Sequence, residues 1–572
     1  MEKRWIDKPL PQTAEENHTI VQLSNSLNIS TLLATLLWQR GISNFEEARL
    51  YFRPSLTHLH DPMLMKDMDK AVARLTKAIE TGENIMIFGD YDVDRTTSVA
   101  MFYGFLRRIY PNLIFYIPDR YTEGYGVSLK GIETARDNDF TLIITLDCGI
   151  KSIQLVKQAQ EWGIDFIICD HHRPGNELPP AVAVLDPKRA DCPYPFKELT
   201  GCGVGFKLLQ AYCQHHDIDE ETYLFPYLDL GVVSIAADIV PIVGENRTMA
   251  HFGLKYLNAS PRSGLKALKE IAGFQGEMDI TNVVFGLGPR INAAGRIKHA
   301  HDAVTLLLAD NEVDAIDFAV GINKHNVDRR EHDTRITQEA LTMIEEDDWL
   351  RNAKTTVLFK PDWHKGVIGI VASRCIEKYH RPTIILTKSD KKVAGSARSV
   401  PGFDLYDAIE ACSDLLEQFG GHTFAAGLTL QEENVKAFQQ KFEEIVSQRI
   451  LPEQLSPMIE VDMRIPLKQI TERFFSIINQ MQPFGPGNMT PVFVSENVRL
   501  RGYPRILKEK HLKLDVFQDD SPVFSAIGFG MAEFYEPLMQ GKAFHICYNI
   551  EINEFQGKRS LQLHLKDIKV SP

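Results

Sequence analysis

The sequence predicts an α/β protein with a parallel-sheet domain, a long linking helix, a second α/β domain and a C-terminal β-barrel. Short apolar runs alternate with helical patterns over residues 81–245, which indicates a parallel sheet covered by helices on both faces. The same alternation returns over residues 349–455. From 456 to 572, strand-like runs lie between turn signals, as in small barrels. Residues 1–80 then form an N-terminal helical segment, and residues 246–348 form a helical connector.

Composition and charge exclude several classes of protein. The chain has 572 residues, 44% apolar and 24% charged, which is enough to bury large cores in about three or four domains. It contains no run of about 18 apolar residues, so no membrane span is expected. The net charge of −13 argues against a wholly basic nucleic-acid coat protein. The chain after residue 460 is nevertheless slightly basic, with 14 Lys and Arg against 12 Asp and Glu.

The N-terminus and the cysteines bear on the cellular compartment. A polar, acidic N-terminus argues against a secretory signal peptide. Eight scattered cysteines without a CxxC pair suit reduced thiols better than a disulfide framework or a zinc ribbon. We therefore expect a cytoplasmic protein.

The predicted elements follow one another in a regular order. Residues 24–41 and 69–82 carry apolar residues at helical spacing. In the first α/β domain, strands are expected at 84–90, 112–119, 141–147, 165–170 and 181–187, and helices at 96–109, 128–138 and 152–163. A long charged helix is expected at 309–348. The second α/β domain and the barrel have expected strands at 355–360, 382–388, 491–502, 513–517, 543–555 and 560–570, with a helix at 367–379.

Acidic and histidine residues follow three of the predicted strands. The groups are Asp90, Asp92 and Asp94, then Asp147, then Asp170-His171-His172, with Asp238 in a helical pattern at 229–241. Because the carboxyl ends of parallel strands meet at one edge, the three strand-end groups are expected to converge. Carboxylates with imidazoles suit Mn²⁺, or Mg²⁺ with fewer nitrogens, and can bridge two ions about 3.5–4 Å apart for a displacement at phosphorus. A single strand-end Asp is most often a helix cap, but three separate clusters exceed what capping requires.

Eight ordered motifs resemble the DHH phosphoesterase superfamily. The first four are DYDVD (90–94), TLDCGI (145–150), CDHHRP (169–174) and AADIVP (236–241). The other four are similar to the substrate-binding DHHA1 domain of that superfamily: GLGPRINAAGRI (286–297), WHKGVIGIVASR (363–374), GSARS (395–399) and FGGHTFAAG (419–427). With a C-terminal OB-like barrel introduced by QPFGPGN (482–488), nearly the whole chain resembles the branch that degrades single-stranded DNA.

The resemblance implies a two-metal 5′→3′ exonuclease that degrades single-stranded DNA to nucleotides in DNA repair and recombination. By carry-over, Asp92 and Asp147 hold one Mn²⁺ or Mg²⁺ ion. The other ion is held by Asp94, Asp147, His171 and Asp238. His172 lies near the scissile phosphate. The catalytic residues that the resemblance implies are His172, Asp147 and Asp94. Asp90 either binds metal or only orients other ligands.

Substrate contacts are expected from the second α/β domain and the barrel. Ser396 and Arg398 face the same way if GSARS is a strand, and they suit a terminal phosphate. The other candidates are Arg296, Arg290, the backbone at Gly420, Gly421 and His422, and Tyr125 as a stacking platform. Residues 499–516 carry six Lys and Arg with one Tyr, which suits a groove that tracks a strand. The plainer alternatives are a tight turn at 420–422, a surface ion pair for Arg398, packing for Tyr125 and a solvated face for 499–516.

Single-stranded DNA is the expected partner of a monomeric chain, with a single-strand-binding protein and a helicase as further candidates and no membrane. Two other functions remain open. One is a phosphodiesterase of short oligonucleotides or cyclic dinucleotides, although such an enzyme needs neither the barrel nor the N-terminal segment. The other is a scaffold of the same superfamily that binds nucleic acid with weakened catalysis, which only Arg95 supports.

Arg95 departs from the superfamily pattern, which has Gly after the last Asp of DYDxD. Gly at that place permits a positive φ or close backbone packing, and Arg would have to accept the same conformation. A guanidinium within about 4–6 Å also competes with a metal for Asp92 and Asp94. We expect Arg95 to weaken metal binding or turnover without abolishing the fold. The alternatives are a side chain that points to solvent or one that meets a substrate phosphate.

Overall fold

The computed structural model describes residues 2–119, 122–124, 126–297, 301–555 and 557–570. The chain divides into two compact units. The larger unit contains Asp7–Asn323 and Glu460–Pro572, and the smaller unit contains Met1–Ile6 and Lys324–Ile459. Tyr125, one of the predicted substrate residues, lies outside the described residues.

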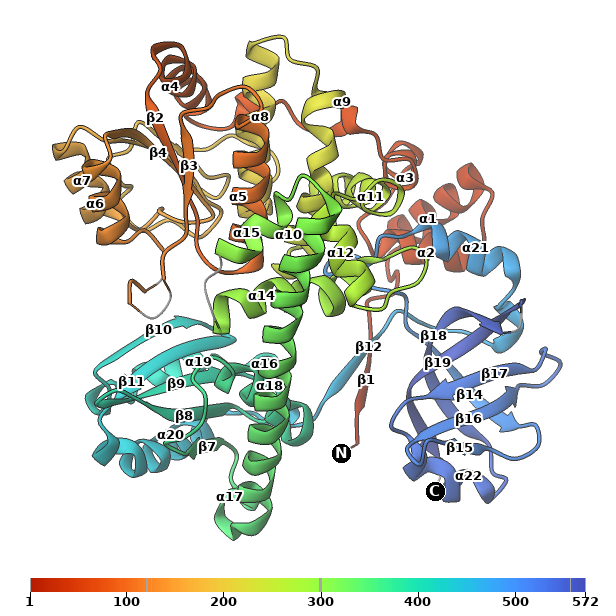
Figure 1. Cartoon of the computed structure of the whole chain (residues 1–572). Helices are drawn as coiled ribbons and strands as arrows, with labels where there is room; N and C mark the ends of the chain where they lie inside the picture. The colour runs from red at the N-terminus through yellow and green to blue at the C-terminus, as the bar shows by residue number, and fades with distance from the viewer. Residues whose placement is uncertain (1, 120–121, 125, 298–300, 556, 571–572) are drawn as a thin grey trace. The chain divides into compact units, whose positions relative to one another are not determined.

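A five-stranded parallel sheet lies in the larger unit (Figure 1). In the order β3-β2-β4-β5-β6, its strands are β3 (Leu113–Tyr116), β2 (Asn84–Phe88), β4 (Phe140–Leu146), β5 (Asp165–Cys169) and β6 (Ala183–Leu185). One face is covered by α6 (Leu129–Asp137) and α7 (Ile153–Glu161), and the other by α4 (Met68–Thr81), α5 (Val93–Leu106) and α8 (Gly201–His215). The strands are nearly all apolar because both faces are buried, which confirms the predicted parallel sheet.

The strand order brings two carboxyl ends together where the chain changes direction. From β2 the chain moves to β3 on one side and then returns to β4 on the other, so β2 and β4 are neighbours. Open α/β sheets bind their ligands at such a switch point, beyond the carboxyl ends of the strands. The loops after β2 and β4 carry Asp92 and Asp147.

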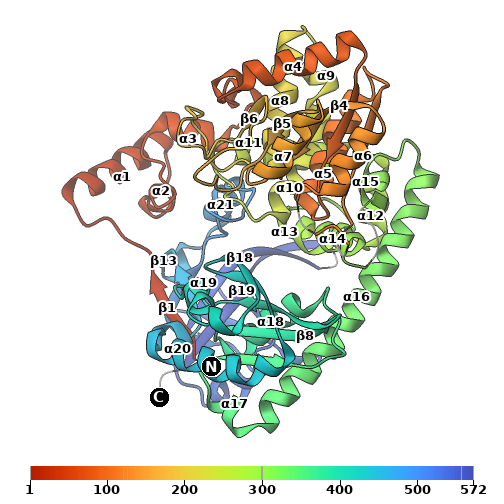
Figure 2. The same ribbon diagram turned by 90° about the vertical axis from the view of Figure 1, so that its left-hand side faces the viewer.

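Further helices extend the core beside α5. They are α9 (Glu220–Tyr223), α10 (Leu228–Ala237), α11 (Gly244–Ala259), α12 (Ser263–Ile271), α13 (Ile280–Asn282), α14 (Gly288–Ile297) and α15 (His301–Leu307). Buried side chains from α10 to α15 join the hydrophobic cluster of the sheet. The chain then enters α16 (Glu312–Glu346), the long green helix of Figure 2, which confirms the helix expected at 309–348. Its 35 residues span about 52 Å at 1.5 Å per residue.

The N-terminal helices pack in two places. Helices α1 (Ala14–Leu27) and α2 (Thr31–Trp38) share a hydrophobic cluster with α21 (Glu472–Gln480) and the barrel, whereas α4 packs against the parallel sheet. Helix α3 (Phe45–Phe52) lies between them in sequence, and a short strand β1 (Arg4–Asp7) precedes them. In the described part of the chain, no single helix is long and apolar enough to cross a membrane. Helices α1 and α2 meet the requirement only as a pair bent by 116°.

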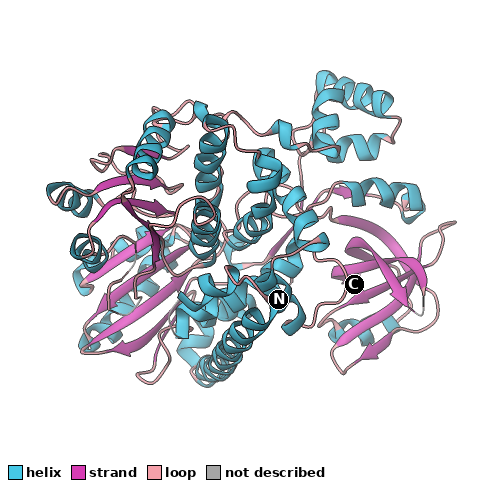
Figure 3. Ribbon diagram, turned by 45° about the horizontal axis from the view of Figure 1, so that its top comes forward, coloured by secondary structure: helices cyan, strands magenta, loops and turns pink. Residues whose placement is uncertain are grey.

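Five strands after residue 490 close into a barrel (Figure 3). They are β14 (Phe493–Leu500), β16 (His511–Phe517), β17 (Phe524–Gly528), β18 (Phe544–Phe555) and β19 (Lys558–Val570). The order β14-β18-β19-β17-β16 returns to β14 through an antiparallel pairing of β14 with β16, so no edge strand remains among these five. This closure confirms the predicted OB-like barrel. Shorter pieces are β12 (Met458–Val461), β13 (Met463–Arg464), β15 (Arg505–Leu507) and α22 (Tyr535–Met539).

The smaller unit contains a second five-stranded sheet. In the order β10-β11-β9-β8-β7, its strands are β10 (Gln418–His422), β11 (Ala425–Leu430), β9 (Lys392–Arg398), β8 (Thr383–Ser389) and β7 (Thr356–Phe359). Its helices are α17 (Asp348–Asn352), α18 (Ile368–Tyr379), α19 (Leu405–Glu410) and α20 (Val435–Arg449). Only β7 and β8 pair in parallel, with α18 between them in the chain; the other pairs are antiparallel.

Candidate active site

Asp92 ends the loop after β2 and is the N-cap of α5. Its Oδ1 accepts a hydrogen bond of 3.0 Å from the backbone N–H of Arg95. An Asp at this position satisfies one of the unpaired N–H groups of the first turn and sets the start of the helix. Helix α5 therefore begins at Val93 rather than at the expected residue 96.

Asp94, in the first turn of α5, points toward the N-terminus of α8. Its carboxylate accepts hydrogen bonds from the backbone N–H groups of Gly201 (2.8 Å) and Cys202 (3.0 Å) and from the hydroxyl of Ser234 (2.6 Å). The partial positive charge of a helix N-terminus stabilises a carboxylate there. These donors hold Asp94 in one orientation, and nothing in the sequence near residue 201 indicated this contact.

Asp147 directly follows β4 in a left-handed backbone conformation with φ 57°. Asp tolerates this conformation better than most residues. Its backbone N–H donates to the carbonyl of Cys169 at the end of β5, with 2.8 Å between N and O. A Cβ at Gly201 would lie 2.2 Å from the Asp147 Cβ, so α8 can approach this closely only with glycine.

Asp170 follows β5 and organises the two histidines after it. Its Oδ1 accepts from the backbone N–H groups of His171 (2.8 Å) and His172 (3.1 Å), and it lies 2.7 Å from His172 Nδ1. Its Oδ2 accepts from the N–H of Ile150 at 3.0 Å. Burial alone would raise the pKa of Asp170, but the hydrogen bonds and charge of His172 and the N–H of Ile150 lower it to about 2. Asp170 is thus a positioning residue for His172.

His171 Nε2 faces three carboxylates. It lies 3.0 Å from Asp147 Oδ1, 3.6 Å from Asp238 Oδ2 and 3.9 Å from Asp94 Oδ2. Asp238 reaches this point from the C-terminal end of α10. Ligand atoms of Asp94, His171 and Asp238 lie within 4.8 Å of one another, as do those of Asp147, His171 and His172. Segments far apart in the sequence therefore place the predicted ligands of one ion together.

These residues fit a divalent cation. Octahedral coordination at about 2.1 Å puts neighbouring ligand atoms about 3.0 Å apart and opposite ones about 4.2 Å apart. The separations of 3.0, 3.6 and 3.9 Å from His171 Nε2 fall within that range. Among the described residues, the buried Oδ1 of Asp147 has no hydrogen-bond partner, although it lies 3.0 Å from His171 Nε2.

The pKa values of the carboxylates agree with this assignment. Burial raises the pKa of Asp147 well above its usual value, with Arg95 opposing and Asp94 adding to the effect. Burial and the charge of Asp94 raise the pKa of Asp238 to about 7. Carboxylates that repel one another in this way are stabilised by a shared cation. Oxygen donors with one imidazole nitrogen suit Mn²⁺ or Mg²⁺.

Arg95 lies in the first turn of α5, so its backbone is right-handed, and of the two reasons considered for a glycine here a positive φ does not apply. Its side chain is only 1% exposed, which also excludes the alternative that it points to solvent. The guanidinium lies among three carboxylates. Nη1 is 2.5 Å from Asp92 Oδ2 and 3.8 Å from Asp90 Oδ2, and Nε is 3.2 Å from Asp147 Oδ2.

Asp90 is fully buried beside the loop that follows β3. Its carboxylate accepts from the backbone N–H groups of Tyr91 (2.8 Å) and Gly126 (2.6 Å). Burial raises its pKa to about 6, although Arg95 and these N–H groups oppose the rise. Bonds from both N–H groups favour the prediction that Asp90 orients its surroundings over the prediction that it binds metal.

Asp186 is a further carboxylate at this edge and is not among the site residues predicted from the sequence. It directly follows β6, is buried, and its Oδ2 has no hydrogen-bond partner among the described residues. Burial raises its pKa to about 7, with Asp170 adding to the rise and His171 opposing it. The available signal was one more strand-end Asp, in AVAVLDP, but a helix cap or turn explained it equally well.

The predicted phosphate-binding pair lies on β9 in the smaller unit. Arg398 Nη1 donates to Ser396 Oγ (3.2 Å) and to the carbonyl of Ala397 (2.8 Å). Burial lowers the pKa of Arg398, and within the described residues it forms no ion pair, contrary to the plainer alternative. A Cβ at Gly369, in the first turn of α18, would lie 2.8 Å from Ser396 Oγ. The pair therefore adjoins a helix N-terminus, which favours anions.

The strand register places the glycine-rich segment on the same face of the sheet. Gly420 pairs with Gly427 on β11, which pairs with Ser396 on β9. By the same register, His422 aligns with Arg398 through the intervening β11. Directly opposite residues of neighbouring strands share a face. The segment is strand β10 rather than the tight turn of the alternative.

Gly421 has a structural reason to be glycine. Its φ is 153°, and a Cβ there would lie 2.4 Å from the carbonyl oxygen of Ala425 on β11. The hairpin between β10 and β11 therefore packs too closely for any side chain at this position.

The two arginines of α14 differ in what the structure describes. Arg290 Nε donates to Asn323 Oδ1 (3.0 Å), and its Nη1 donates to the carbonyl of Gly286 (2.7 Å). The bond to Asn323 ties α14 to α16, so Arg290 has a clear structural task. Arg296 lies in α14, but its side chain falls outside the described part of the chain.

The basic stretch 499–516 forms β15, its flanking turns and parts of β14 and β16. Tyr503 lies in the turn before β15 and is 79% exposed. Ile506 on β15 is also exposed. An exposed aromatic ring among basic residues offers a stacking platform for bases, which a purely solvated face would not need.

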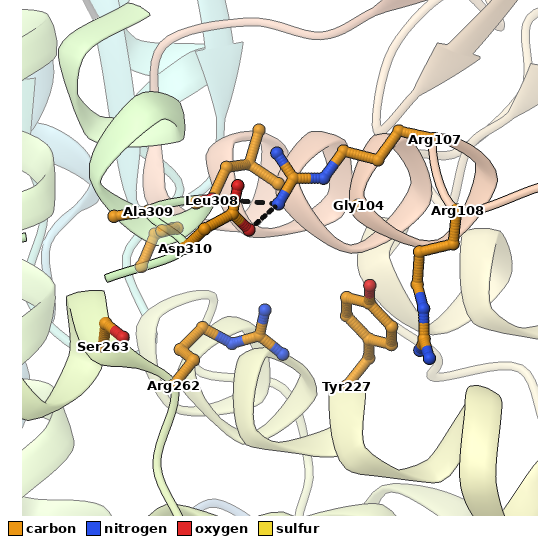
Figure 4. Close-up of a pocket in the computed structure, with 10 residues that line it drawn as sticks. Gly104, Arg107, Arg108, Tyr227, Arg262, Ser263, Leu308, Ala309 and Asp310 are labelled. Carbon is orange, nitrogen blue, oxygen red and sulfur yellow. Dashed lines mark hydrogen bonds and ion pairs between the residues drawn. The ribbon is translucent and has the colours of Figure 1, made fainter. Parts of the chain in front are cut away.

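A separate pocket of about 580 Å³ lies at the C-terminal end of α5 (Figure 4). The rise of 1.5 Å per residue puts this end about 20 Å along the helix from the carboxylates. Figure 4 shows Arg107 bonded to Asp310 and to the carbonyl of Leu308. Arg262 forms a bidentate ion pair with Asp229, which is not drawn in Figure 4. Two of the guanidinium groups that line the pocket are thus neutralised, and we assign this pocket no role.

Comparison with known proteins agrees with this architecture. Three family models match: the DHH family, N-terminal domain, over residues 84–235; the DHHA1 domain over 352–448; and the RecJ OB domain over 461–567. The parallel sheet with its carboxylates and histidines, followed by DHHA1, defines a DHH phosphoesterase.

The relatives narrow this class. The chain is 37% identical to the single-stranded-DNA-specific exonuclease RecJ of Bacillus subtilis (strain 168), over 99% of this chain and 71% of that protein. It also resembles the crystal structure of RecJ from Thermus thermophilus in complex with Mn²⁺, with a TM-score of 0.84 and 26% identity, covering 100% of this chain and 80% of that one. The Mg²⁺ complex of the same protein has a TM-score of 0.79 and 25% identity, covering 100% and 78%. The chain belongs to the RecJ family of single-stranded-DNA-specific exonucleases.

Proposed function

We propose that this protein is a divalent-metal-dependent exonuclease that degrades single-stranded DNA from its 5′ end. The observation that carries the proposal is the convergence of Asp94, Asp147, His171 and Asp238 at the switch point of the parallel sheet. Relatives along the whole chain are named single-stranded-DNA-specific exonucleases, and solved relatives contain Mn²⁺ or Mg²⁺. We place the activity in DNA repair and recombination.

The residues of the site have distinct tasks in this reaction. A bound divalent ion supplies Lewis acidity and lowers the pKa of water for attack on phosphorus. Asp94, Asp147, His171 and Asp238 would hold that ion. Although burial opposes it, the Asp170 carboxylate at Nδ1 raises the pKa of His172, so the protonated ring can donate from Nε2 to an oxygen of the scissile phosphate.

The 5′ phosphate binds, in this proposal, to the smaller unit. Support comes from Arg398, a half-buried guanidinium beside Ser396 and the first turn of α18. Guanidinium groups bind phosphate through two parallel hydrogen bonds. The backbone of β10 at Gly420, and the aligned His422, would border the same phosphate.

The barrel extends the DNA-binding surface. Residues 499–516 would contact the phosphates of the strand through their Lys and Arg side chains, while Tyr503 stacks on a base. We further propose a single-strand-binding protein and a helicase as partners. A cytoplasmic location is supported by the eight cysteines, which are all buried and take part in no disulfide bond.

Digestion of end-labelled DNA tests the proposed function. Single strands labelled at the 5′ end should release labelled nucleotide first, while strands labelled at the 3′ end should shorten progressively. Duplexes of the same sequence should persist, and EDTA should stop the reaction. Equal attack on duplex, or activity that survives EDTA, would refute the proposal.

A further inference from the structure

We propose that the guanidinium of Arg95 takes the place of one of the two divalent ions, so that this protein binds one ion rather than two. The inference deepens the proposed function and rests on it. It concerns the ion that the resemblance assigns to Asp92 and Asp147. To the remaining ion site, at Asp94, Asp147, His171 and Asp238, Asp147 contributes Oδ1, which faces His171 Nε2, and not Oδ2, which faces Arg95.

Arg95 contacts the same two carboxylates that the resemblance assigns to this ion. Nη1 lies 2.5 Å from Asp92 Oδ2, and Nε lies 3.2 Å from Asp147 Oδ2. Nε also donates to the carbonyl of Asp147 at 2.8 Å. A metal ion bound to these carboxylates would need to approach their oxygens to about 2.1 Å. The nitrogen atoms already fill that space, so the guanidinium and the ion exclude each other.

The two oxygens of Asp147 divide between the two cations. Oδ2 faces Arg95, whereas Oδ1 faces His171 Nε2 at 3.0 Å and has no hydrogen-bond partner in the part of the chain that the structure describes. A carboxylate that bridges two metal ions uses its oxygens in the same way, one for each ion. Asp147 therefore bridges a fixed organic cation and one ion site.

Arg95 is held where it lies. Its side chain is 1% exposed, and its position in the first turn of α5 directs the Cα–Cβ bond toward the helix N-terminus, where Asp92 is the cap. Arginine stays protonated at every accessible pH, so the positive charge cannot be removed by titration. A divalent ion beside Arg95 would be repelled by the guanidinium charge, and the carboxylates of Asp92 and Asp147 would already be bonded to Arg95.

The substitution has a chemical consequence. A guanidinium can neutralise carboxylates and attract phosphate, but it does not lower the pKa of a water molecule as a metal ion does. With one ion, the stabilisation of the attacking and leaving oxygens falls to a single Lewis acid. We expect slower turnover than in Arg95→Gly, with the fold unchanged.

Counting bound ions tests this inference without DNA or activity. The protein is freed of metal with EDTA, dialysed and titrated with Mn²⁺, while free Mn²⁺ is followed by electron paramagnetic resonance. The native chain should bind one ion per molecule and Arg95→Gly should bind two. Arg107→Gly removes a guanidinium from the C-cap of the same helix, far from the carboxylates, and should still bind one.

Two further variants keep the test decisive if glycine disturbs the helix. Arg95→Met keeps the bulk without the charge, and circular dichroism reports its fold. Asp238→Asn should reduce the native stoichiometry from one toward zero, while Arg95→Gly combined with Asp238→Asn should keep one ion. Two ions in the native chain, or one in Arg95→Gly, would overturn the inference. No ion in either protein would instead refute the metal centre and the proposed function.

Discussion

Arg95→Gly should make the stability of the protein depend more steeply on Mn²⁺. Without metal, the variant leaves Asp147, whose side chain is 3% exposed, without its cation. Removing one partner of a buried ion pair costs about 3–5 kcal/mol. Asp92 is 37% exposed and adds little. Burial raises the pKa of Asp147, so without its cation the carboxylate can be protonated rather than remain a buried charge. The lower end of the range of about 3–5 kcal/mol therefore applies.

The glycine adds a backbone cost of about 1 kcal/mol inside a helix. The metal-free variant should therefore be less stable than the native chain by about 4 kcal/mol. Each ion site stabilises the fold by about 2.7 kcal/mol when Mn²⁺ is at 100 times its Kd. The native chain gains this stabilisation from one site and Arg95→Gly gains it from two. At that Mn²⁺ concentration, the difference in the free energy of unfolding between the two proteins should therefore fall to about 1 kcal/mol.

Thermal unfolding in EDTA and in increasing Mn²⁺, followed by scanning calorimetry, measures this difference. The Tm of Arg95→Gly should start below that of the native protein and rise more steeply with Mn²⁺. Arg107→Gly should run parallel to the native protein at every concentration. Equal rises for the native chain and Arg95→Gly would refute the reasoning, since they would mean that no second site had been opened.

Three further predictions concern the remaining parts of the site. Asp170→Asn should lower kcat about 10–100-fold with little change in KM, because His172 loses the partner that orients its ring; a changed KM alone in steady-state kinetics would contradict this. Arg398→Ala should raise KM at least tenfold for 5′-phosphorylated strands and leave Mn²⁺ binding unchanged, whereas equal effects on 5′-hydroxyl strands would argue against a phosphate contact. Tyr503→Ala should weaken binding of strands long enough to reach the barrel by about 1–3 kcal/mol, measured by fluorescence anisotropy, with Lys508→Ala showing a salt-dependent loss instead. A Tyr503 variant that binds long strands normally would leave 499–516 as a solvated face.

Much of the ion site could be predicted because it lies at strand ends. The apolar runs that become β2, β4 and β5 are unambiguous, and the acidic residues follow them directly. Parallel strands then bring Asp92, Asp147 and His171 to one edge without further information. The convergence of Asp238 depended on the resemblance, because a helix end carries no comparable geometric signal.

The placement of Arg95 could not be predicted for a physical reason. The apolar pattern of α5 suggested a start at residue 96, which left Arg95 in a loop. Asp92 in fact caps the helix at Val93 and brings Arg95 into the first turn. If α5 began at residue 96, the Arg95 side chain could point in several directions. Because α5 begins at Val93, the Arg95 side chain is directed toward the carboxylates.

Contacts between side chains that are distant in the sequence could not be predicted from the sequence either. Gly201 supports Asp94 and packs on Asp147 from a segment with no acidic or histidine signal. Strand β10, with the sequence QFGGH, has too few apolar residues to be recognised. Its register with β11 and β9, which aligns His422 with Arg398, is a tertiary property.

The location of bound Mn²⁺ tests the central claim most directly. A crystal grown with Mn²⁺ and measured at the manganese absorption edge would show each ion as an anomalous peak. We expect one peak, coordinated by Asp94, Asp147, His171 and Asp238, with the Arg95 guanidinium still between Asp92 and Asp147. A peak between Asp92 and Asp147 with Arg95 displaced would contradict the one-ion inference. The absence of any peak beside His171 would contradict the metal centre itself.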